Sequence, residues 1–86
     1  MVTIELFGVP RLRAGRDAFC VDAASLGQAF RALGEACPSL APSVVDGDRL
    51  QPHYLVAVNG TQFTADPSTP LRDGDVVVLV SAEAGG

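Results

Sequence analysis

The sequence predicts an α+β domain in which one main helix covers one face of a mixed sheet of about four to five strands. Three observations lead to this prediction. Apolar and polar residues alternate along residues 2–6, an apolar stripe with helical spacing occupies residues 26–37, and five consecutive apolar residues fill positions 76–80. These patterns are typical of a half-buried strand, a surface helix and a central strand, respectively. With 86 residues, 48% of them hydrophobic and 19% charged, the chain is expected to fold as one globular domain.

The N-terminal part of the chain is expected to form a β-hairpin. The apolar residues of the segment 2–6 share one face of the first strand, so Phe7 points to the other face. Residues 8–10 contain a glycine and a proline and should end this strand. Residues 11–17 are predicted to form a polar turn, and residues 18–22 to return as the second strand.

Residues 25–37 carry the signals of a helix. Ser25 is a typical N-cap, and Gln28, three residues later, completes the pattern of a capping box. Pro38 is expected to end the helix. The apolar stripe that faces the sheet is predicted to consist of Leu26, Phe30, Leu33 and Cys37.

The second half of the chain begins with a predicted loop over residues 39–52. Residues 54–58 have the composition of a strand, and Asn59-Gly60 is the strongest short signal for a hairpin turn. Residues 61–64 are expected to form the short return strand. Asp73-Gly74-Asp75 is predicted to be a tight turn into the last strand.

A hairpin followed by one helix, and then by strands that return beside the first strand, is the β-grasp or ubiquitin-like arrangement. A single helix covers only one face of the sheet, so the other face stays open. Alternation along the last strand gives two sets of residues, Val76, Val78 and Val80 on one face and Val77 and Leu79 on the other. One set is expected to join Phe7 on the open face, where an exposed apolar patch indicates a partner-binding site.

The β-grasp domain is predicted to comprise residues 1–80, and residues 81–86 to form a flexible C-terminal tail that ends in Gly85-Gly86. An extended tail of this length reaches roughly 20 Å. Because glycine lacks a Cβ atom, it passes through a narrow channel more easily than any other residue. A carboxylate presented in this way suits activation at the ATP site of another enzyme.

Charge and composition argue against several classes of function. A net charge of −4 argues against nucleic acid or an anionic membrane as the main partner, and fits docking on a basic protein surface. No segment resembles a signal peptide or a spanning helix, so we expect a cytoplasmic protein with reduced cysteines. The single histidine, His53, has no second ligand arranged near it, so no metal site is predicted. No recognisable catalytic set or phosphate loop is present, and we do not expect an enzyme.

Four segments resemble the ubiquitin-like sulfur carriers, a family that includes the small subunit of molybdopterin synthase and the sulfur carrier of the thiazole pathway. These segments are Leu6–Gly8, Val56–Thr61, Leu71–Val76 and Gly85–Gly86. The resemblance implies that an adenylating enzyme, similar to ubiquitin-activating enzymes, uses ATP to activate the C-terminal carboxylate, while the carrier itself binds no cofactor. It further implies a sulfur donor, such as a persulfide from a rhodanese or a cysteine desulfurase, that forms a thiocarboxylate. An acceptor synthase then receives the sulfur.

The resemblance also implies roles for individual residues. Gly86 would carry the acyl-adenylate and then the thiocarboxylate, at the end of a slim tail that includes Ala84 and Gly85. The residues expected to contact partner enzymes are Phe7, Val80 and Gln62. Val80 stands where the molybdopterin branch often has an aromatic residue, and Gln62 where that branch often has an apolar contact residue.

Two alternatives stay open beside the sulfur carrier. The first is a ubiquitin-like modifier that forms isopeptide bonds with other proteins, and the second is a plain β-grasp binding module whose tail has no role. A carrier accumulates the thiocarboxylate, a pure modifier need not, and a plain module keeps its function without Gly86. The candidate destinations of the sulfur are molybdopterin, cysteine and sulfur-containing secondary metabolites such as thiosugars.

Overall fold

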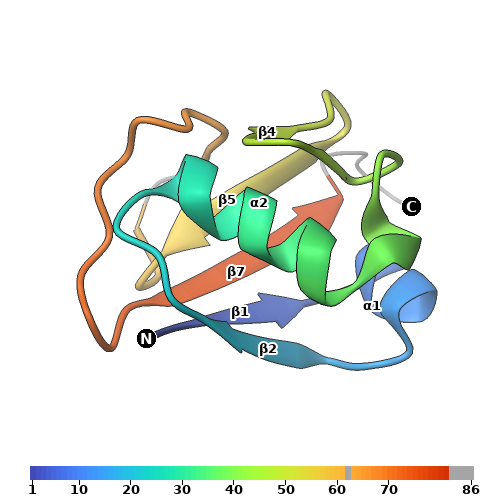
Figure 1. The fold of residues 1–86 in the computed structure, drawn as a ribbon, viewed down its shortest axis with the longest axis horizontal. Helices are drawn as coiled ribbons and strands as arrows, with labels where there is room; N and C mark the ends of the chain where they lie inside the picture. Colours follow the sequence, from blue (N-terminus) through green and yellow to red (C-terminus); the bar gives the residue numbers. More distant parts are fainter. Residues whose placement is uncertain (62, 82–86) are drawn as a thin grey trace.

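Five strands form a mixed sheet in the order β2-β1-β7-β5-β6, and the long helix α2 lies across one face of it (Figure 1). The computed structural model describes residues 1–61 and 63–81. The strands of this sheet are β1 (Val2–Leu6), β2 (Ala18–Val21), β5 (Tyr54–Val58), β6 (Phe63–Thr64) and β7 (Val76–Ser81). The predicted β-grasp fold is therefore confirmed.

Strand β7 lies in the middle of the sheet. It pairs in parallel with β1 and antiparallel with β5, so neighbours cover both of its edges. This position explains why five consecutive residues of the strand are apolar. The parallel pair joins the first and last strands of the chain, while β1 and β2 form the predicted antiparallel hairpin.

Helix α2 (Leu26–Ala36) begins where the sequence predicts. The Ser25 hydroxyl accepts a hydrogen bond from the Gln28 amide at 3.3 Å, and the Gln28 side chain accepts one from the Ala24 amide at 2.8 Å. In the usual capping box the second bond reaches the N-cap amide, so here the Gln28 side chain reaches one residue further back. The helix ends at Ala36, shortly before Pro38, as predicted.

The core lies between α2 and the sheet. All four residues of the predicted helical stripe are buried, and the stripe packs on apolar side chains of β1, β2, β5 and β7. Each large aliphatic or aromatic side chain that is fully buried contributes about 1.5–3 kcal/mol to stability. The largest fully buried side chains are those of Val2, Ile4, Leu6, Leu26, Phe30, Leu33, Leu40, Val44, Val45, Val56, Val77 and Leu79.

A short helix, α1 (Val9–Ala14), stands where the sequence analysis predicted a polar turn. That prediction is wrong because α1 has no apolar stripe: Leu12 is exposed and only Pro10 is buried. Its signals are Pro10 in the first turn and Gly15 after the last turn, where φ is 69°. The helix packs against β7 and the 3-10 helix η1 (Pro38–Leu40), at one end of the sheet (Figure 1).

The predicted loop over residues 39–52 contains more regular structure than expected. Besides η1 it includes a two-stranded ladder, β3 (Val45–Asp46) and β4 (Arg49–Leu50), which packs beside α2. Leu40, Val44 and Val45 are buried, so this segment covers part of the core.

The hairpin between β5 and β6 has the predicted turn. Asn59 and Gly60 both have a positive φ, 53° and 74°, as a type I′ turn requires. The Thr61 amide donates to the Val58 carbonyl at 3.0 Å and closes the turn.

The return strand of this hairpin has an unexpected register. A two-residue turn closed between residues 58 and 61 would pair Val56 with Phe63. In the structure Ala57 pairs with Phe63, and Val56 with Thr64. Successive side chains of a strand point to opposite faces, so this shift of one residue moves Phe63 from the core face to the open face.

Candidate functional site

The face of the sheet that α2 leaves uncovered carries apolar residues of β7. Val77 and Leu79 are 1% and 0% exposed and belong to the core. Val76, Val78 and Val80 therefore occupy the open face, where they are half-buried. The prediction that one of the two sets lies on the open face is confirmed, and the structure shows which set it is.

Neighbouring strands extend this apolar surface. Val80 pairs with Leu55, and Val78 pairs with Ala57, which on its other side pairs with Phe63. Phe63 is 52% exposed. The open-face patch is defined as Phe7, Leu55, Phe63, Val76, Val78 and Val80.

The fold brings Phe7 and Val80 together. The register of the parallel strands pairs Glu5 with Val78 and Leu6 with Leu79, and the Phe7 amide donates to the Leu79 carbonyl at 3.1 Å. The next step of this register places Phe7 beside Val80 on the open face. Phe7 is 42% exposed, whereas Leu6 is 1% exposed, as the predicted alternation requires.

The remaining predicted site residues, Gln62, Ala84, Gly85 and Gly86, lie outside the described residues, and their roles stay predictions. Strand β7 ends at Ser81, directly after Val80. The open-face patch therefore adjoins the point from which the chain continues toward Gly86.

Sequence reasoning missed Leu55 and Phe63 as members of the patch. Alternation along β5 puts Leu55 and Val56 on opposite faces, but only the burial of Val56 in the structure shows that Leu55 lies on the open face. The position of Phe63 depends on the shifted register of β6, which no local feature of the sequence predicts.

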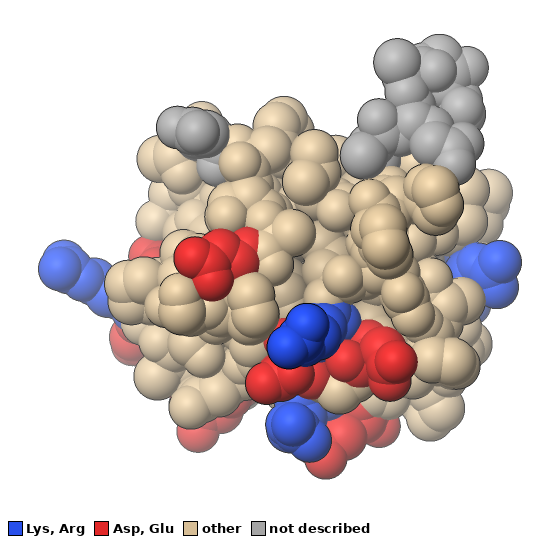
Figure 2. Space-filling model, turned by 90° about the horizontal axis from the view of Figure 1, so that it is seen from above, with Lys and Arg blue, Asp and Glu red and all other residues tan. Residues whose placement is uncertain are grey.

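Charged side chains surround the open-face patch but are few within it. Figure 2 looks down on the molecule, with the side of α2 at the bottom of the view and the opposite side of the sheet at the top. Acidic and basic side chains lie in the middle and lower parts of this view, which looks along one edge of the sheet. On the open face itself, Glu5 of β1 pairs with Val78 and places one carboxylate beside the open-face patch. An apolar surface with polar residues at its edge is typical of a protein-binding site.

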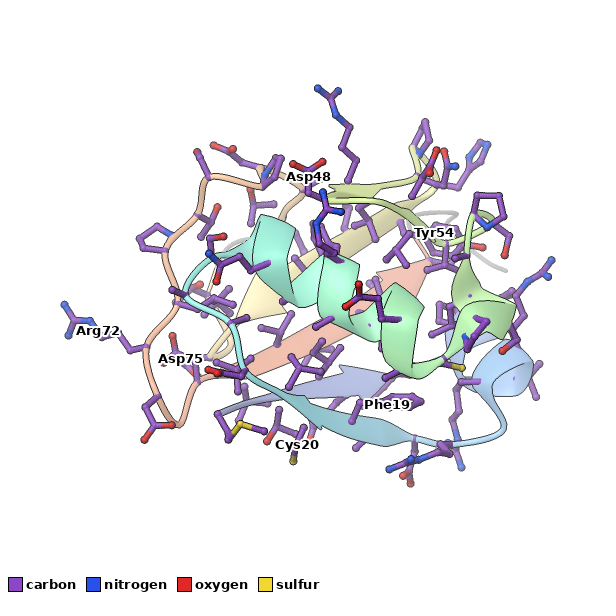
Figure 3. All side chains as sticks on the ribbon, in the orientation of Figure 1. Phe19, Cys20, Asp48, Tyr54, Arg72 and Asp75 are labelled. Carbon is purple, nitrogen blue, oxygen red and sulfur yellow. The ribbon has the colours of Figure 1, made fainter. Side chains whose placement is uncertain are left out.

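At the start of β7, Asp75 and Asn59 hold the hairpin turn against the strand. The Asn59 side chain donates to the Asp75 carboxylate and accepts from the Val76 amide, both at 2.8 Å. The Asp75 carboxylate also accepts from the Arg72 amide at 2.8 Å. The bond from the Arg72 amide, and then that from Asn59, lower the pKa of Asp75. Figure 3 shows Asp75 at the start of β7 and Arg72 extending away from it.

This network belongs to the predicted turn at residues 73–75. Gly74 has a φ of 90°, which glycine adopts easily and other residues rarely do. Together with the type I′ turn, the network fixes the start of β7 and the loop end of the β5–β6 hairpin.

The cysteines do not form a site. Cys37 is buried as part of the core, and Cys20 is exposed on β2, next to the buried Phe19 (Figure 3). Within residues 1–61 and 63–81, no group of three or more histidine, cysteine or acidic side chains is arranged to hold a metal ion. The helices of this part of the chain are too short or too polar to cross a membrane.

The profile of the ThiS family matches residues 4–86. The chain belongs to the ThiS family. The match covers the sheet from the middle of β1 onward, the open-face patch and the end of the chain, and it confirms the resemblance to ubiquitin-like sulfur carriers. Members of this family are small carrier proteins.

Solved structures agree with this assignment. SAMP1 from Haloferax volcanii is similar with a TM-score of 0.82 and 30% identity, over 99% of this chain and 98% of that chain. A chain of the Amycolatopsis orientalis BexX/CysO complex has the same fold, with a TM-score of 0.81 and 19% identity over 100% of both chains. A chain of the complex of subunits 1 and 2 of the molybdopterin-converting factor from Helicobacter pylori 26695 is also similar. Its TM-score is 0.65 and its sequence identity is 25%, over 99% of this chain and 97% of that chain. No curated protein sequence matches the chain.

Two of these structures are complexes between proteins. Proteins of this fold therefore bind protein partners, which agrees with the exposed apolar surface of the present chain.

Proposed function

We propose that this chain is a sulfur carrier, whose Gly86 carboxylate is activated by an adenylating enzyme and converted to a thiocarboxylate. The observation that supports this proposal most directly is the position of the open-face patch beside the end of β7, in a chain whose family match continues to residue 86. An enzyme that binds the patch holds the domain while the last residues reach its ATP site.

The chemistry takes place in two steps. In the first step an oxygen of the Gly86 carboxylate attacks the α-phosphorus of ATP, and pyrophosphate leaves. In the second step a sulfur nucleophile attacks the acyl carbon, and AMP leaves. Hydrogen sulfide gives the thiocarboxylate directly, whereas a persulfide gives an acyl disulfide that a thiol then reduces to the thiocarboxylate and a new disulfide.

The domain contributes binding and positioning to this sequence of reactions. Phe7 and Phe63 are exposed aromatic residues on an otherwise aliphatic surface, and exposed aromatic residues are frequent hot spots of protein interfaces. The adenylating enzyme, the sulfur donor and the acceptor synthase would each recognise the same carrier. The acceptor is a biosynthetic enzyme for molybdopterin, cysteine or a sulfur-containing secondary metabolite.

The intact mass of the protein tests the proposal. The mass of the protein from cells must first identify Gly86 as the last residue. The purified chain is then incubated with ATP, a candidate activating enzyme and sulfide. We expect the mass gain of one oxygen-to-sulfur exchange, which is lost in a variant without Gly86. An unchanged mass, while another carrier of the family is converted by its own enzyme in parallel, would contradict the proposal.

A second candidate function is protein modification, because the H. volcanii relative is called a small archaeal modifier protein. A modifier uses the same adenylate, but the acyl group is transferred to a lysine amine of a target protein. The two functions differ in their products: a stable isopeptide on other proteins indicates a modifier, and accumulation of the thiocarboxylate without such conjugates indicates a carrier.

A further inference from the structure

Helix α1 exposes a large apolar side chain that plays no part in the core. Leu12 is 81% exposed, the highest value among the exposed large hydrophobic residues of the described chain. Only Pro10 of this helix is buried. Isolated exposed leucines are common on protein surfaces, so the exposure of Leu12 alone does not indicate a binding site.

Leu12 also lies in a basic segment of the chain. Arg11, Arg13 and Arg16 are three of the six basic residues of a chain whose net charge is −4. Among the described residues, no carboxylate lies within 4 Å of their guanidinium groups, since the only such ion pair there involves the N-terminal amine and Asp73. Arg11 and Arg13 lie in the last turn of α1, where their positive charges interact favourably with the helix dipole. This interaction accounts for basic residues at that place, but it does not account for the exposed Leu12 between them.

The surface at this point is hollowed. An open hollow of about 400 Å³ is lined by Arg11, Leu12, Gly15, Arg16 and Asp17. A second hollow of about 230 Å³ shares Arg11 and Asp17 with the first and extends along β1 to Phe7. Its lining includes the acidic residue Glu5, so an acidic ligand is expected in the first hollow and not in the second. The Arg16 guanidinium lies 4.4 Å from the centre of the Phe19 ring, and this cation–π contact holds Arg16 at the rim of the larger hollow.

We propose that this α1 surface, defined as Arg11, Leu12 and Arg16, binds an acidic segment of a partner protein that carries an apolar side chain. The guanidinium groups pair with carboxylates of the segment, and its apolar side chain packs on Leu12. Asp17 in the lining opposes any anion and limits the affinity. A carboxylate-bearing peptide suits the surface better than nucleic acid or an anionic membrane, because the rest of the protein is acidic and repels extended polyanions.

This inference does not depend on the proposed sulfur chemistry. The α1 surface precedes β2, and none of its residues belongs to the open-face patch. Binding of the acidic segment should therefore be unchanged in a variant without Gly86, so the failure of one proposal leaves the other intact.

The experiment is an NMR titration of the isotope-labelled full chain with an acetylated glutamate peptide that has one central leucine. We expect saturable shifts at residues 9–17. Replacement of both Arg11 and Arg16 by glutamine should weaken binding roughly tenfold, since each exposed ion pair contributes about a twofold to fivefold effect. Asp17→Asn should strengthen binding about twofold by removal of the opposing charge.

Three further variants separate charge from packing. Arg72→Gln is the matched control, because Arg72 is also an exposed arginine but lies at the opposite end of the molecule from α1 (Figures 1 and 3). It should leave binding unchanged. Leu12→Ser should weaken binding at low and high salt alike, whereas the loss in the arginine variants should fade as salt rises. Arg11→Lys should keep most of the affinity.

Several results would overturn the proposal. Shifts outside residues 9–17, equal affinity of the arginine and control variants, or no saturable shift at about 1 mM peptide would each do so. Tighter binding of a single-stranded oligonucleotide or of anionic vesicles would assign the surface to a different partner. Self-association that the arginine variants abolish would assign it to a second copy of this chain. Spectra with native dispersion establish that each variant is folded.

Discussion

Val77 and Val78 are adjacent residues of the same type on the same strand, and they lie on the two different faces of the sheet. Val77 is 1% exposed beneath α2, whereas Val78 is half-buried on the open face. The covered face stabilises the fold, and the open face leaves apolar surface in water, which contributes little to stability until a partner covers it. Apolar composition alone does not separate these two roles; the helix that covers one face does.

The comparison is tested first by two matched substitutions. Val77→Ala should lower the free energy of unfolding by about 2–3 kcal/mol, because it removes buried methyl groups and leaves a cavity. Val78→Ala should lower it by less than about 1 kcal/mol, since its side chain is only partly buried. Urea unfolding of both variants measures the difference. Equal losses would mean that the two faces are equally important for stability.

The converse experiment removes an aromatic side chain from the open face. Phe7→Ala should reduce kcat/KM for adenylation by the activating enzyme about tenfold or more, as expected for a hot spot of the interface. Its melting temperature should change little, because Phe7 is 42% exposed. Arg31→Ala serves as the control and should leave adenylation unchanged, because Arg31 is exposed on α2 and belongs to neither proposed binding surface. A Phe7→Ala variant that is activated at the normal rate would show that the open-face patch does not bind this enzyme.

Substitutions in the hairpin turn between β5 and β6 should have a smaller effect on stability. Asn59→Ala should cost about 1–2 kcal/mol of stability, because it removes two hydrogen bonds, to Asp75 and Val76, and puts alanine at a φ of 53°. Asn59→Gly loses the same hydrogen bonds but accepts the positive φ, so it should be the less harmful change. Thermal unfolding distinguishes them, and a larger loss for glycine would contradict this explanation.

The smallest expected effect is a change in the response to acid. The pKa of Asp75 is lowered in the folded protein by hydrogen bonds from the Arg72 amide and from Asn59. The carboxylate therefore stabilises the fold above the unfolded pKa of about 3.9, and this contribution is lost as pH falls through the lower folded value. Asp75→Asn should lower Tm at pH 7, and its difference from the unchanged protein should shrink between about pH 5 and pH 2.

The control for this pH experiment is Asp46→Asn. Asp46 is exposed on β3, and its carboxylate forms no hydrogen bond with the other described residues. This substitution should leave Tm at pH 7 unchanged, because it removes no hydrogen bond among the described residues. A constant difference between the Asp75→Asn variant and the unchanged protein at every pH would mean that the carboxylate charge is not responsible.

Most of the fold could be predicted from the sequence where local signals agree with tertiary packing. The alternation in residues 2–6, the cap at Ser25 and the turn at Asn59-Gly60 each specify an element by a short-range rule, and each is present. The short helix α1 was missed, because its exposed arginines and Leu12 give no apolar stripe and its only signals are Pro10 and Gly15. Without a buried face, a six-residue helix depends on its contacts with β7 and η1.

The candidate site was predictable only in part. Phe7 and Val80 follow from the resemblance and lie together on the open face, whereas Phe63 joins them because β6 is shifted by one residue.

By itself, the sequence determined the order of the main strands and the principal helix, and the division of β7 into two apolar sets. The tertiary structure decided which of these sets α2 covers, because alternation separates two faces but carries no information about the side on which the helix packs. It also decided the register of β6, which depends on pairing across strands. The open-face patch therefore depends on the face that α2 covers and on the register of β6, both of which are set by contacts between residues far apart in the sequence.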